Sequence, residues 1–358
     1  MARSGSFAAM RALTVIPGKA GSLAVQDVPE PDDALGDVLV DGMAVGVCAT
    51  DRELAEGLYG WAPAGSERLV IGHESLGRVR TAPDGSGFAP GDLIVGVVRM
   101  PDPRPCGACA HGEWDMCRNG EYTEHGIKSL HGFAAERWRV RSDHAVRLDP
   151  RLEPVGMLLE PTTIVAKAWE QVDRIGARAW SDPQSVLITG AGPVGLLAAL
   201  IGAQRGLDVH VLDRMAGGVK PELVRMLGAT YHAGDAAELV ERLAPDVVIE
   251  GTGAVPVVRA VLSNPKPYAI TVLTGLSNPG EHVTIDLGPV NRAMVLGNAV
   301  AVGSVNANLR HYETGAAVLA AADLGWLQRM ITRRVPMERY ADAFAAQPDD
   351  VKVVLTVE

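Results

Sequence analysis

The sequence predicts an α/β protein that combines a mostly β module with a doubly wound parallel sheet. Three observations carry this prediction. The first half is rich in glycine, proline and short apolar runs, which is typical of strands joined by long loops. After about residue 183, strand-like and helix-like segments alternate at the spacing of βαβ units. A glycine-rich turn also joins the first strand of that series to its helix.

Apolar runs bounded by turn residues give the individual elements. In the first half they predict strands at 38–47 and 93–98. The alternating series begins with a strand at 186–189 and a helix at 193–205 that ends before a glycine. It continues with strand 209–212, helix 221–227, strand 247–249, helix 255–262, strand 269–273, the extended stretch 300–305 and helix 311–322. The strand-like tail at 351–357 could close back on the first module.

Composition excludes several classes of function. The chain has 358 residues, enough for two domains of about 150 residues each. Its net charge of −10 offers no basic footprint for nucleic acid or an anionic membrane surface. No apolar run reaches the roughly 18 residues that a membrane helix requires, and residues 1–12 show no secretion-signal pattern. We therefore expect a cytoplasmic protein with reduced cysteines and neither a nucleic-acid nor a membrane partner.

The glycine-rich turn matches the dinucleotide fingerprint G-x-G-x-x-G. Its residues are Gly190-Ala191-Gly192-Pro193-Val194-Gly195. Gly190 permits the tight turn, Gly192 lets the backbone approach a pyrophosphate, and Gly195 lets the helix pack closely on the strand. Free amides at the helix N-terminus then attract the phosphates. Because strand, spacing and helix agree, the turn indicates dinucleotide binding rather than an ordinary glycine-rich loop.

An acidic residue, Asp213, stands at the end of the next predicted strand. A carboxylate at this place accepts hydrogen bonds from the adenosine ribose hydroxyls and repels a 2′-phosphate, so NAD is favoured over NADP. The neighbouring Arg214 could accommodate that phosphate, which keeps NADP open as a cofactor. The alternative interpretation of Asp213 is an ordinary surface carboxylate.

Three residues of types that bind zinc occur far apart in the first half: Cys48, His73 and Glu160. A thiolate, an imidazole and a carboxylate form a three-ligand set that leaves a fourth position open, as catalytic zinc requires. Structural interpretations compete with this hypothesis. Cys48 alone would be a small buried side chain, and Glu160 would be a charge at a helix N-terminus just before Pro161.

Three further cysteines, Cys106, Cys109 and Cys117, have the spacing C-x2-C-x7-C. In a reduced chain this spacing favours a structural zinc loop, which needs a fourth ligand. Five residues are close enough in sequence to supply it: Asp102, His111, Asp115, Glu121 and Glu124. The alternative is a degenerate loop that binds no metal.

Taken together, these motifs resemble the zinc-dependent medium-chain dehydrogenase/reductase superfamily, and within it the microbial glucose 1-dehydrogenases. The resemblance covers nearly the whole chain. Besides the fingerprint, its landmarks are Cys48-Ala49-Thr50-Asp51, Gly72-His73-Glu74, Val97-Val98-Arg99, the stretch 126–133, Leu159-Glu160-Pro161, Glu250-Gly251-Thr252-Gly253-Ala254 and Val302-Gly303-Ser304-Val305-Asn306.

The resemblance implies a GroES-like catalytic domain, at 1–182 and 307–358, split around a Rossmann domain at 183–306. It implies that zinc is held by Cys48, His73 and Glu160. Glu74 would be an exchangeable ligand or a carboxylate just behind the ligands, and Thr50 would relay the substrate proton.

The resemblance also assigns residues to the substrate and the cofactor. Glu124 and Asn306 are similar to residues that contact sugar hydroxyls. Three further residues, together with Asn306, fall where relatives line the nicotinamide half of the cofactor: Thr252, Leu276 and Val305.

The chain departs from the superfamily pattern at three positions. Pro103 replaces the first of the usual four cysteines in the structural loop, which leaves the fourth ligand open. Asp213 stands where related archaeal enzymes often carry polar or basic residues, which favours NAD. Ile164 replaces an acidic sugar contact that some of those enzymes have.

We therefore predict a zinc enzyme that transfers hydride from a sugar hydroxyl, most simply the anomeric hydroxyl of an aldose such as glucose, to NAD(P) and yields the lactone. One alternative is a medium-chain dehydrogenase for a polyol, a cyclitol or a specialised-pathway alcohol, which Ile164 favours. Another is a non-catalytic NAD-binding regulatory protein. The resemblance further implies a homodimer or homotetramer, for which the apolar stretch 298–305 could supply a pairing edge.

Overall fold

The computed structural model describes residues 9–357, and the contacts within it divide the chain into two compact units. Unit 1 comprises residues 1–160 and 308–358, and unit 2 comprises residues 161–307. The helix α3 (Leu159–Gly176) therefore belongs to unit 2 from Pro161 onward, whereas the sequence placed the whole segment up to residue 182 in the first domain. Residues 1–8, which showed no secretion-signal pattern, lie outside the described residues.

Unit 1 is mostly β. Its strands are β1 (Ala9–Val15), β2 (Ala24–Pro29), β3 (Val38–Val47), β4 (Leu69–Val70), β5 (Glu74–Thr81), β6 (Leu93–Gly96), β7 (Arg99–Met100), β8 (Thr123–His125), β9 (Ser129–Leu130), β10 (Arg137–Val140), β11 (Ala145–Arg147), β18 (Ile331–Pro336) and β19 (Lys352–Thr356). Its helices are α1 (Ala49–Ala55), α2 (Gly107–Ala110), α9 (Leu309–Ala321), α10 (Leu324–Met330) and α11 (Tyr340–Phe344).

The main sheet of unit 1 has the strand order β11-β6-β5-β3-β19-β18, and β10 also pairs with β3. The C-terminal strand β19 is antiparallel to β3, with Val353 opposite Val47 and Val354 opposite Gly46. The predicted closure of the tail on the first module is therefore confirmed. Because β3 also pairs with β5, it lies between the two strands that begin with Glu74 and Lys352.

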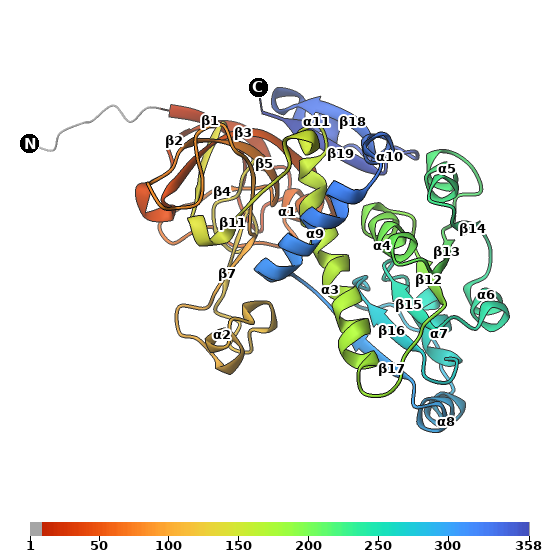
Figure 1. Cartoon of the computed structure of the whole chain (residues 1–358). Helices are drawn as coiled ribbons and strands as arrows, with labels where there is room; N and C mark the ends of the chain where they lie inside the picture. The colour runs from red at the N-terminus through yellow and green to blue at the C-terminus, as the bar shows by residue number, and fades with distance from the viewer. Residues whose placement is uncertain (1–8, 358) are drawn as a thin grey trace, which may run out of the picture. The chain divides into compact units, whose positions relative to one another are not determined.

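Unit 2 contains six described strands in a parallel sheet of order β14-β13-β12-β15-β16-β17, several of which run side by side in Figure 1. This is the strand order of a doubly wound dinucleotide-binding fold. All strands are parallel, but the chain adds strands on one side of β12 up to β14 and on the other side from β15 onward. The strands are β12 (Ser185–Thr189), β13 (Asp208–Leu212), β14 (Thr230–His232), β15 (Val247–Glu250), β16 (Ile270–Leu273) and β17 (Val300–Gly303). The helices besides α3 are α4 (Pro193–Gln204), α5 (Val219–Met226), α6 (Ala236–Leu243), α7 (Val255–Ser263) and α8 (Leu287–Gly297).

Alternating strand residues bury both faces of this sheet. Leu187 and Val248 pack in one core cluster with the apolar residues of α6 and α7. Val186 and Val209 point the other way, toward Gly202 of α4. Continuous apolar strands are required for such a sheet, because successive side chains reach opposite buried faces.

Among the elements that the sequence reasoning did not predict are α1, α3, α6, α8, α10, α11, β14 and β18, and several short strands of unit 1. The start of α3 carries Thr162, Thr163 and Ile164, β-branched residues that lower helix propensity, and burial of both threonines outweighs that preference. The signal for α6 was present in Asp235, whose carboxylate accepts hydrogen bonds from the amides of Ala237 and Glu238. None of the helices in residues 9–357 combines the length and hydropathy needed to cross a bilayer.

Candidate metal and dinucleotide sites

A group of metal-binding side chains converges in unit 1. The sulfur of Cys48 lies 3.1 Å from Nε2 of His73, and the ligand atoms of Cys48, His73 and Glu74 all lie within 4.8 Å of one another. Cys48 comes directly before α1, and the other two residues stand where β5 begins. Residues 25 positions apart therefore meet because β3 and β5 pair, with Gly46 opposite Glu74.

Asp51 contacts two of these residues. Its Oδ2 accepts a hydrogen bond of 2.9 Å from the backbone amide of Cys48, and its Oδ1 lies 3.5 Å from Nδ1 of His73. The carboxylate thus lies beside one ring nitrogen, while Nε2 faces the cysteine sulfur. A histidine whose second nitrogen is held by a carboxylate is the usual arrangement at zinc sites.

The electrostatics of the cluster suit a cation. Burial opposes a charged His73 ring, but the negative groups Cys48 and Asp51 raise the pKa of His73 well above its usual value. Burial raises the pKa of the Cys48 thiol, although His73 opposes this shift. The same negative groups would attract a divalent cation placed between the sulfur and the imidazole. The donor set therefore fits zinc.

Glu160 lies close to this cluster but is not one of the three residues whose ligand atoms meet. Burial and the Glu74 carboxylate raise the pKa of Glu160 to about 7, while the positive charges of His73 and Lys352 oppose the shift. Of the predicted trio, Cys48 and His73 are thus in contact, and His73 influences the pKa of the third residue, Glu160. Thr50, the predicted proton relay, is half-buried in the first turn of α1.

A buried lysine stands behind the cluster, and the sequence reasoning missed it. Lys352 is 1% exposed, and its Nζ lies 2.6 Å from each carboxylate oxygen of Glu74. A side chain on Gly46 would prevent this contact, because its Cβ would lie 1.8 Å from Oε2 of Glu74. The signal was a single charge inside the apolar tail Val351-Lys352-Val353-Val354-Leu355, where an unpaired lysine is costly.

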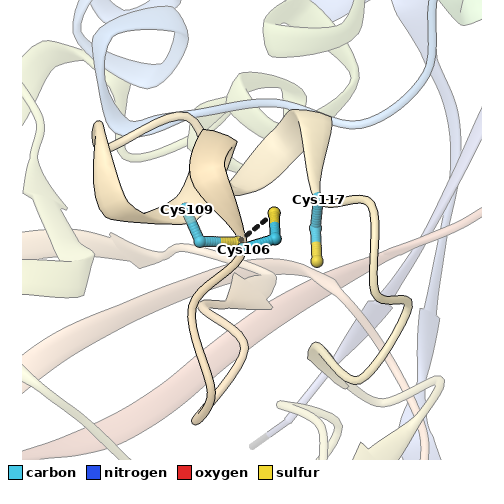
Figure 2. A group of neighbouring side chains, drawn as sticks. All are labelled: Cys106, Cys109 and Cys117. Carbon is cyan, nitrogen blue, oxygen red and sulfur yellow. Dashed lines mark hydrogen bonds between the residues drawn. The ribbon is translucent and has the colours of Figure 1, made fainter.

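The three remaining cysteines gather in the loop around α2 (Figure 2). All are free thiols, and their sulfurs lie within 4.8 Å of one another. The amide of Cys109 is the main cause that lowers the pKa of Cys106 to about 6, whereas burial raises that of Cys109 to about 11. Soft sulfur donors at these distances fit a structural zinc ion.

Glu124, a predicted sugar contact, forms a buried ion pair. Its Oε1 accepts hydrogen bonds of 3.0 Å from both Nε and Nη2 of Arg99, which lies opposite it on β7. The Arg99 guanidinium also lies 3.7 Å from the centre of the Tyr122 ring. The pair holds the carboxylate of Glu124 in one place, and Arg99 was not among the predicted site residues.

The glycine fingerprint of unit 2 has the geometry that the motif predicts. Gly190 has a φ of +92°, which favours glycine, and its carbonyl oxygen would lie 1.8 Å from a Cβ on Gly195. A Cβ on Gly192 would meet no atom within 4 Å, so that backbone faces open space. Gly190 and Gly192 line a cavity of about 630 Å³, which provides the approach that a pyrophosphate needs. Pro193 and Val194 form the first turn of α4.

Asp213 lines the same cavity with Arg214 and Lys220. Its carboxylate accepts hydrogen bonds of 2.7 Å from the amides of Ala191 and Arg214, and Lys220 Nζ lies 3.4 Å away. Burial opposes ionisation, but the Ala191 amide and the Lys220 charge lower the pKa of Asp213. The ionised carboxylate of Asp213 therefore lines the cavity together with two cationic side chains, Arg214 and Lys220.

The predicted nicotinamide residues lie at or after the carboxyl ends of β15, β16 and β17. Thr252 and Leu276 line the cavity, and Leu276 is 84% exposed. The Thr252 amide donates to the buried carboxylate of Glu250 at 2.8 Å. Val305 accepts from Lys167 Nζ at 2.9 Å through its carbonyl oxygen, and Asn306 has a left-handed φ of +61°.

Comparisons with known proteins identify relatives of this chain. Residues 34–150 match the alcohol dehydrogenase GroES-like domain, and residues 153–357 match the glucose dehydrogenase C-terminus. The chain is 41% identical to a glucose 1-dehydrogenase of Thermoproteus tenax, and the match covers 98% of this chain and 100% of that protein. It is 37% identical to a glucose 1-dehydrogenase of Methanocella arvoryzae, over 97% and 99% of the two chains.

A solved structure extends the likeness to three dimensions. The fold matches that of the Haloferax mediterranei glucose dehydrogenase in complex with NADP, Zn and gluconolactone, with a TM-score of 0.89. The two chains are 27% identical, and the match covers 98% of this chain and 99% of the other.

Proposed function

The chain belongs to the zinc-dependent glucose dehydrogenase family of medium-chain dehydrogenases, and we propose that it oxidises the anomeric hydroxyl of an aldose such as glucose. The products would be the aldonolactone, NAD(P)H and a proton. The observation that carries the proposal is the meeting of Cys48 and His73, at 3.1 Å, in a chain that also carries an open dinucleotide fingerprint. A non-catalytic regulator would need no such ligand set.

We propose that Cys48, His73 and Glu160 hold a zinc ion, with Glu74 as the exchangeable carboxylate beside them. Zinc bound there supplies a Lewis acid that lowers the pKa of the substrate hydroxyl. Support for this ligand set comes from the part-buried cysteine–histidine contact and from the effect of the cluster's charges on Glu160.

The other residues of unit 1 would orient the substrate and accept its proton. The hydroxyl of Thr50, two residues after Cys48, would take the substrate proton and pass it toward solvent. The carboxylate of Glu124, fixed by Arg99, would accept a hydrogen bond from a sugar hydroxyl. A carboxylate held by two hydrogen bonds gives up little side-chain entropy when it binds a substrate hydroxyl.

Unit 2 would hold the cofactor, whose nicotinamide accepts the hydride. The backbone at Gly192 and the start of α4 would bind the pyrophosphate, and Asp213 the adenosine ribose. Thr252, Leu276, Val305 and Asn306 would line the nicotinamide half, with Asn306 also contacting the sugar. The cavity that contains Gly192 and Asp213 supports this assignment.

The proposed function is tested by the near-ultraviolet absorbance of reduced nicotinamide. Zinc-loaded protein is incubated with D-glucose and either NAD or NADP, and lactone formation is followed in parallel. We expect equal amounts of reduced cofactor and lactone. The proposal would be refuted if none of the sugars or alcohols tested led to reduced cofactor in protein that still binds NAD.

A polyol or cyclitol is the second candidate substrate, and Ile164 is the residue that favours it. This side chain is half-buried in α3 and offers no hydrogen bond where some related enzymes place a carboxylate. A panel of aldoses, polyols and cyclitols separates the candidates by their kcat/KM values. A polyol that exceeds every aldose would replace glucose as the substrate class.

We predict that NAD is the better cofactor and that Asp213→Ser reverses the preference. Loss of the carboxylate removes an acceptor for the ribose hydroxyls and leaves Lys220 and Arg214 to pair with a 2′-phosphate. We expect kcat/KM for NAD to fall roughly 10-fold, about the effect of one charged hydrogen bond. Asp208→Asn, at the opposite end of β13, is the control. An unchanged NADP-to-NAD ratio in Asp213→Ser would contradict the assignment.

We also propose a homodimer or homotetramer that pairs through β17. This strand ends the sheet order, its residues Val300 to Val302 are half-exposed, and α8 exposes Val295 and Leu296. Light scattering on the purified protein tests this, because one chain has a mass of 37.7 kDa. The cytoplasm is the proposed compartment, since its reducing conditions keep all four thiols available as ligands.

A further inference from the structure

We propose that Asp102 completes a second zinc site with Cys106, Cys109 and Cys117, so that three sulfurs and one carboxylate oxygen hold the metal. The family resemblance leaves this ligand open, because Pro103 stands where a first cysteine is usual. The inference concerns metal binding in the loop around α2 and does not depend on the substrate of the enzyme.

The three sulfurs already have the spacing of a metal site. A zinc–sulfur bond of about 2.3 Å in a tetrahedral site places two sulfurs about 3.8 Å apart. The Sγ atoms of Cys106 and Cys109 lie 3.7 Å apart, as the dashed line in Figure 2 marks. The amide of Arg118 also donates to Cys106 Sγ at 3.4 Å, a contact that stabilises a thiolate. These three sulfurs leave one corner of a tetrahedron to fill.

Asp102 reaches this cluster from the chain before it. Its Oδ2 accepts a hydrogen bond of 3.6 Å from the Cys117 thiol, and its Oδ1 accepts one of 2.8 Å from the Arg104 amide. A carboxylate extends one bond farther from the backbone than a thiol. Asp102 can therefore supply the ligand that Pro103, the next residue, cannot.

The carboxylate of Asp102 is buried without a cationic partner. The residue is 3% exposed, and within residues 9–357 no lysine, arginine or histidine forms an ion pair with it. The nearby Arg104 directs its guanidinium to Glu121 instead. An unpaired buried carboxylate is costly, so the structure calls for a cation at this point, and three thiolates stand beside it.

Each of the other four candidate ligands has at least one partner outside the cysteine cluster. Asp115 accepts from Asn308 at 3.0 Å, and Glu124 is paired with Arg99. Glu121 is paired with Arg104, and the Nδ1 of His111 contacts the Gly107 carbonyl oxygen at 2.7 Å. Asp102, by contrast, contacts a cysteine sulfur through its side chain.

Metal content of purified variants tests the proposal. We expect about two zinc ions per wild-type chain and about one in Asp102→Ala, because a site with three donors binds zinc far more weakly. Asp115→Asn, a matched change of a neighbouring buried carboxylate, should keep both ions. Cys48→Ala should lose the other ion, which identifies the one that remains.

Two zinc ions in Asp102→Ala, released by a chelator at the wild-type rate, would overturn the proposal. The proposal would also be overturned if the wild-type chain held one zinc ion and Cys48→Ala held none.

A second variant guards against simple misfolding. Asp102→His places a metal-binding nitrogen as many bonds from the backbone as the carboxylate oxygen and should keep both metals. With cobalt in place of zinc, the d–d absorption band of the ion in the loop should shift relative to that of the wild type, because a nitrogen ligand replaces an oxygen ligand. An unchanged band would exclude position 102 from the metal. Neither readout depends on turnover, so failure here and failure of the sugar-oxidation proposal are distinguishable.

Discussion

Cys48→Ala should abolish sugar oxidation and remove one zinc ion per chain while the protein remains folded. The side chain is one of two in direct contact in the proposed catalytic site, with its sulfur 3.1 Å from His73 Nε2. Loss of the Lewis acid removes several kcal/mol of transition-state stabilisation, so kcat/KM should fall by about 10³ or more. Zinc content, circular dichroism and the glucose assay measure the three effects.

Cys106→Ala is the control for this prediction. It removes a thiol from the loop around α2 and should release the other zinc ion while leaving Cys48 and His73 in place. Full activity and wild-type zinc content in Cys48→Ala would refute the catalytic assignment. Loss of activity in Cys106→Ala with the catalytic ion retained would instead show that the loop supports the active fold.

Lys352→Met should destabilise the protein strongly, because it leaves the carboxylate of Glu74 buried without its cation. Both side chains are 2% exposed, and Nζ lies 2.6 Å from each carboxylate oxygen. Breaking one partner of a buried pair costs about 3–5 kcal/mol. Urea unfolding of the zinc-loaded protein measures the difference.

Two comparisons make the test specific. Arg104 and Glu121 also lie 2.6 Å apart, but on the surface, so Arg104→Met should have little effect. The double variant Lys352→Met with Glu74→Gln should recover part of the lost stability, because no buried charge is then left unpaired. A loss in Lys352→Met no greater than in Arg104→Met would show that the buried pair does not stabilise the fold.

The same ion pair bears on the proposed chemistry. Lys352 holds both oxygens of Glu74 within 2.6 Å, and Gly46 leaves the space for them. A carboxylate held in this way stays beside Cys48 and His73 with its charge balanced. Lys352 is therefore a positioning residue for Glu74, and the zinc content of Lys352→Met is the readout that a purely structural role would leave unchanged.

Much of the fold was predictable because its signals are local. The run 186–189 is apolar and ends at Gly190, and the helix after it ends just before Gly206, close to the observed bounds of β12 and α4. Helix α3 was not predictable in this way. Its first turns carry β-branched residues, which have low helix propensity. Their burial in the folded protein outweighs that preference and stabilises the helix.

The candidate site shows the same division. The sequence determined the dinucleotide turn, because Gly190, Gly192 and Gly195 lie within one turn and the contacts they permit are between near neighbours. It also supplied the residue types of both metal sites. Only the tertiary structure decided which side chains meet: Glu74 with Lys352 across β3, and Asp102 with Cys117. Strand pairing and loop closure set those contacts between residues far apart in the chain, and no local pattern of residues records them.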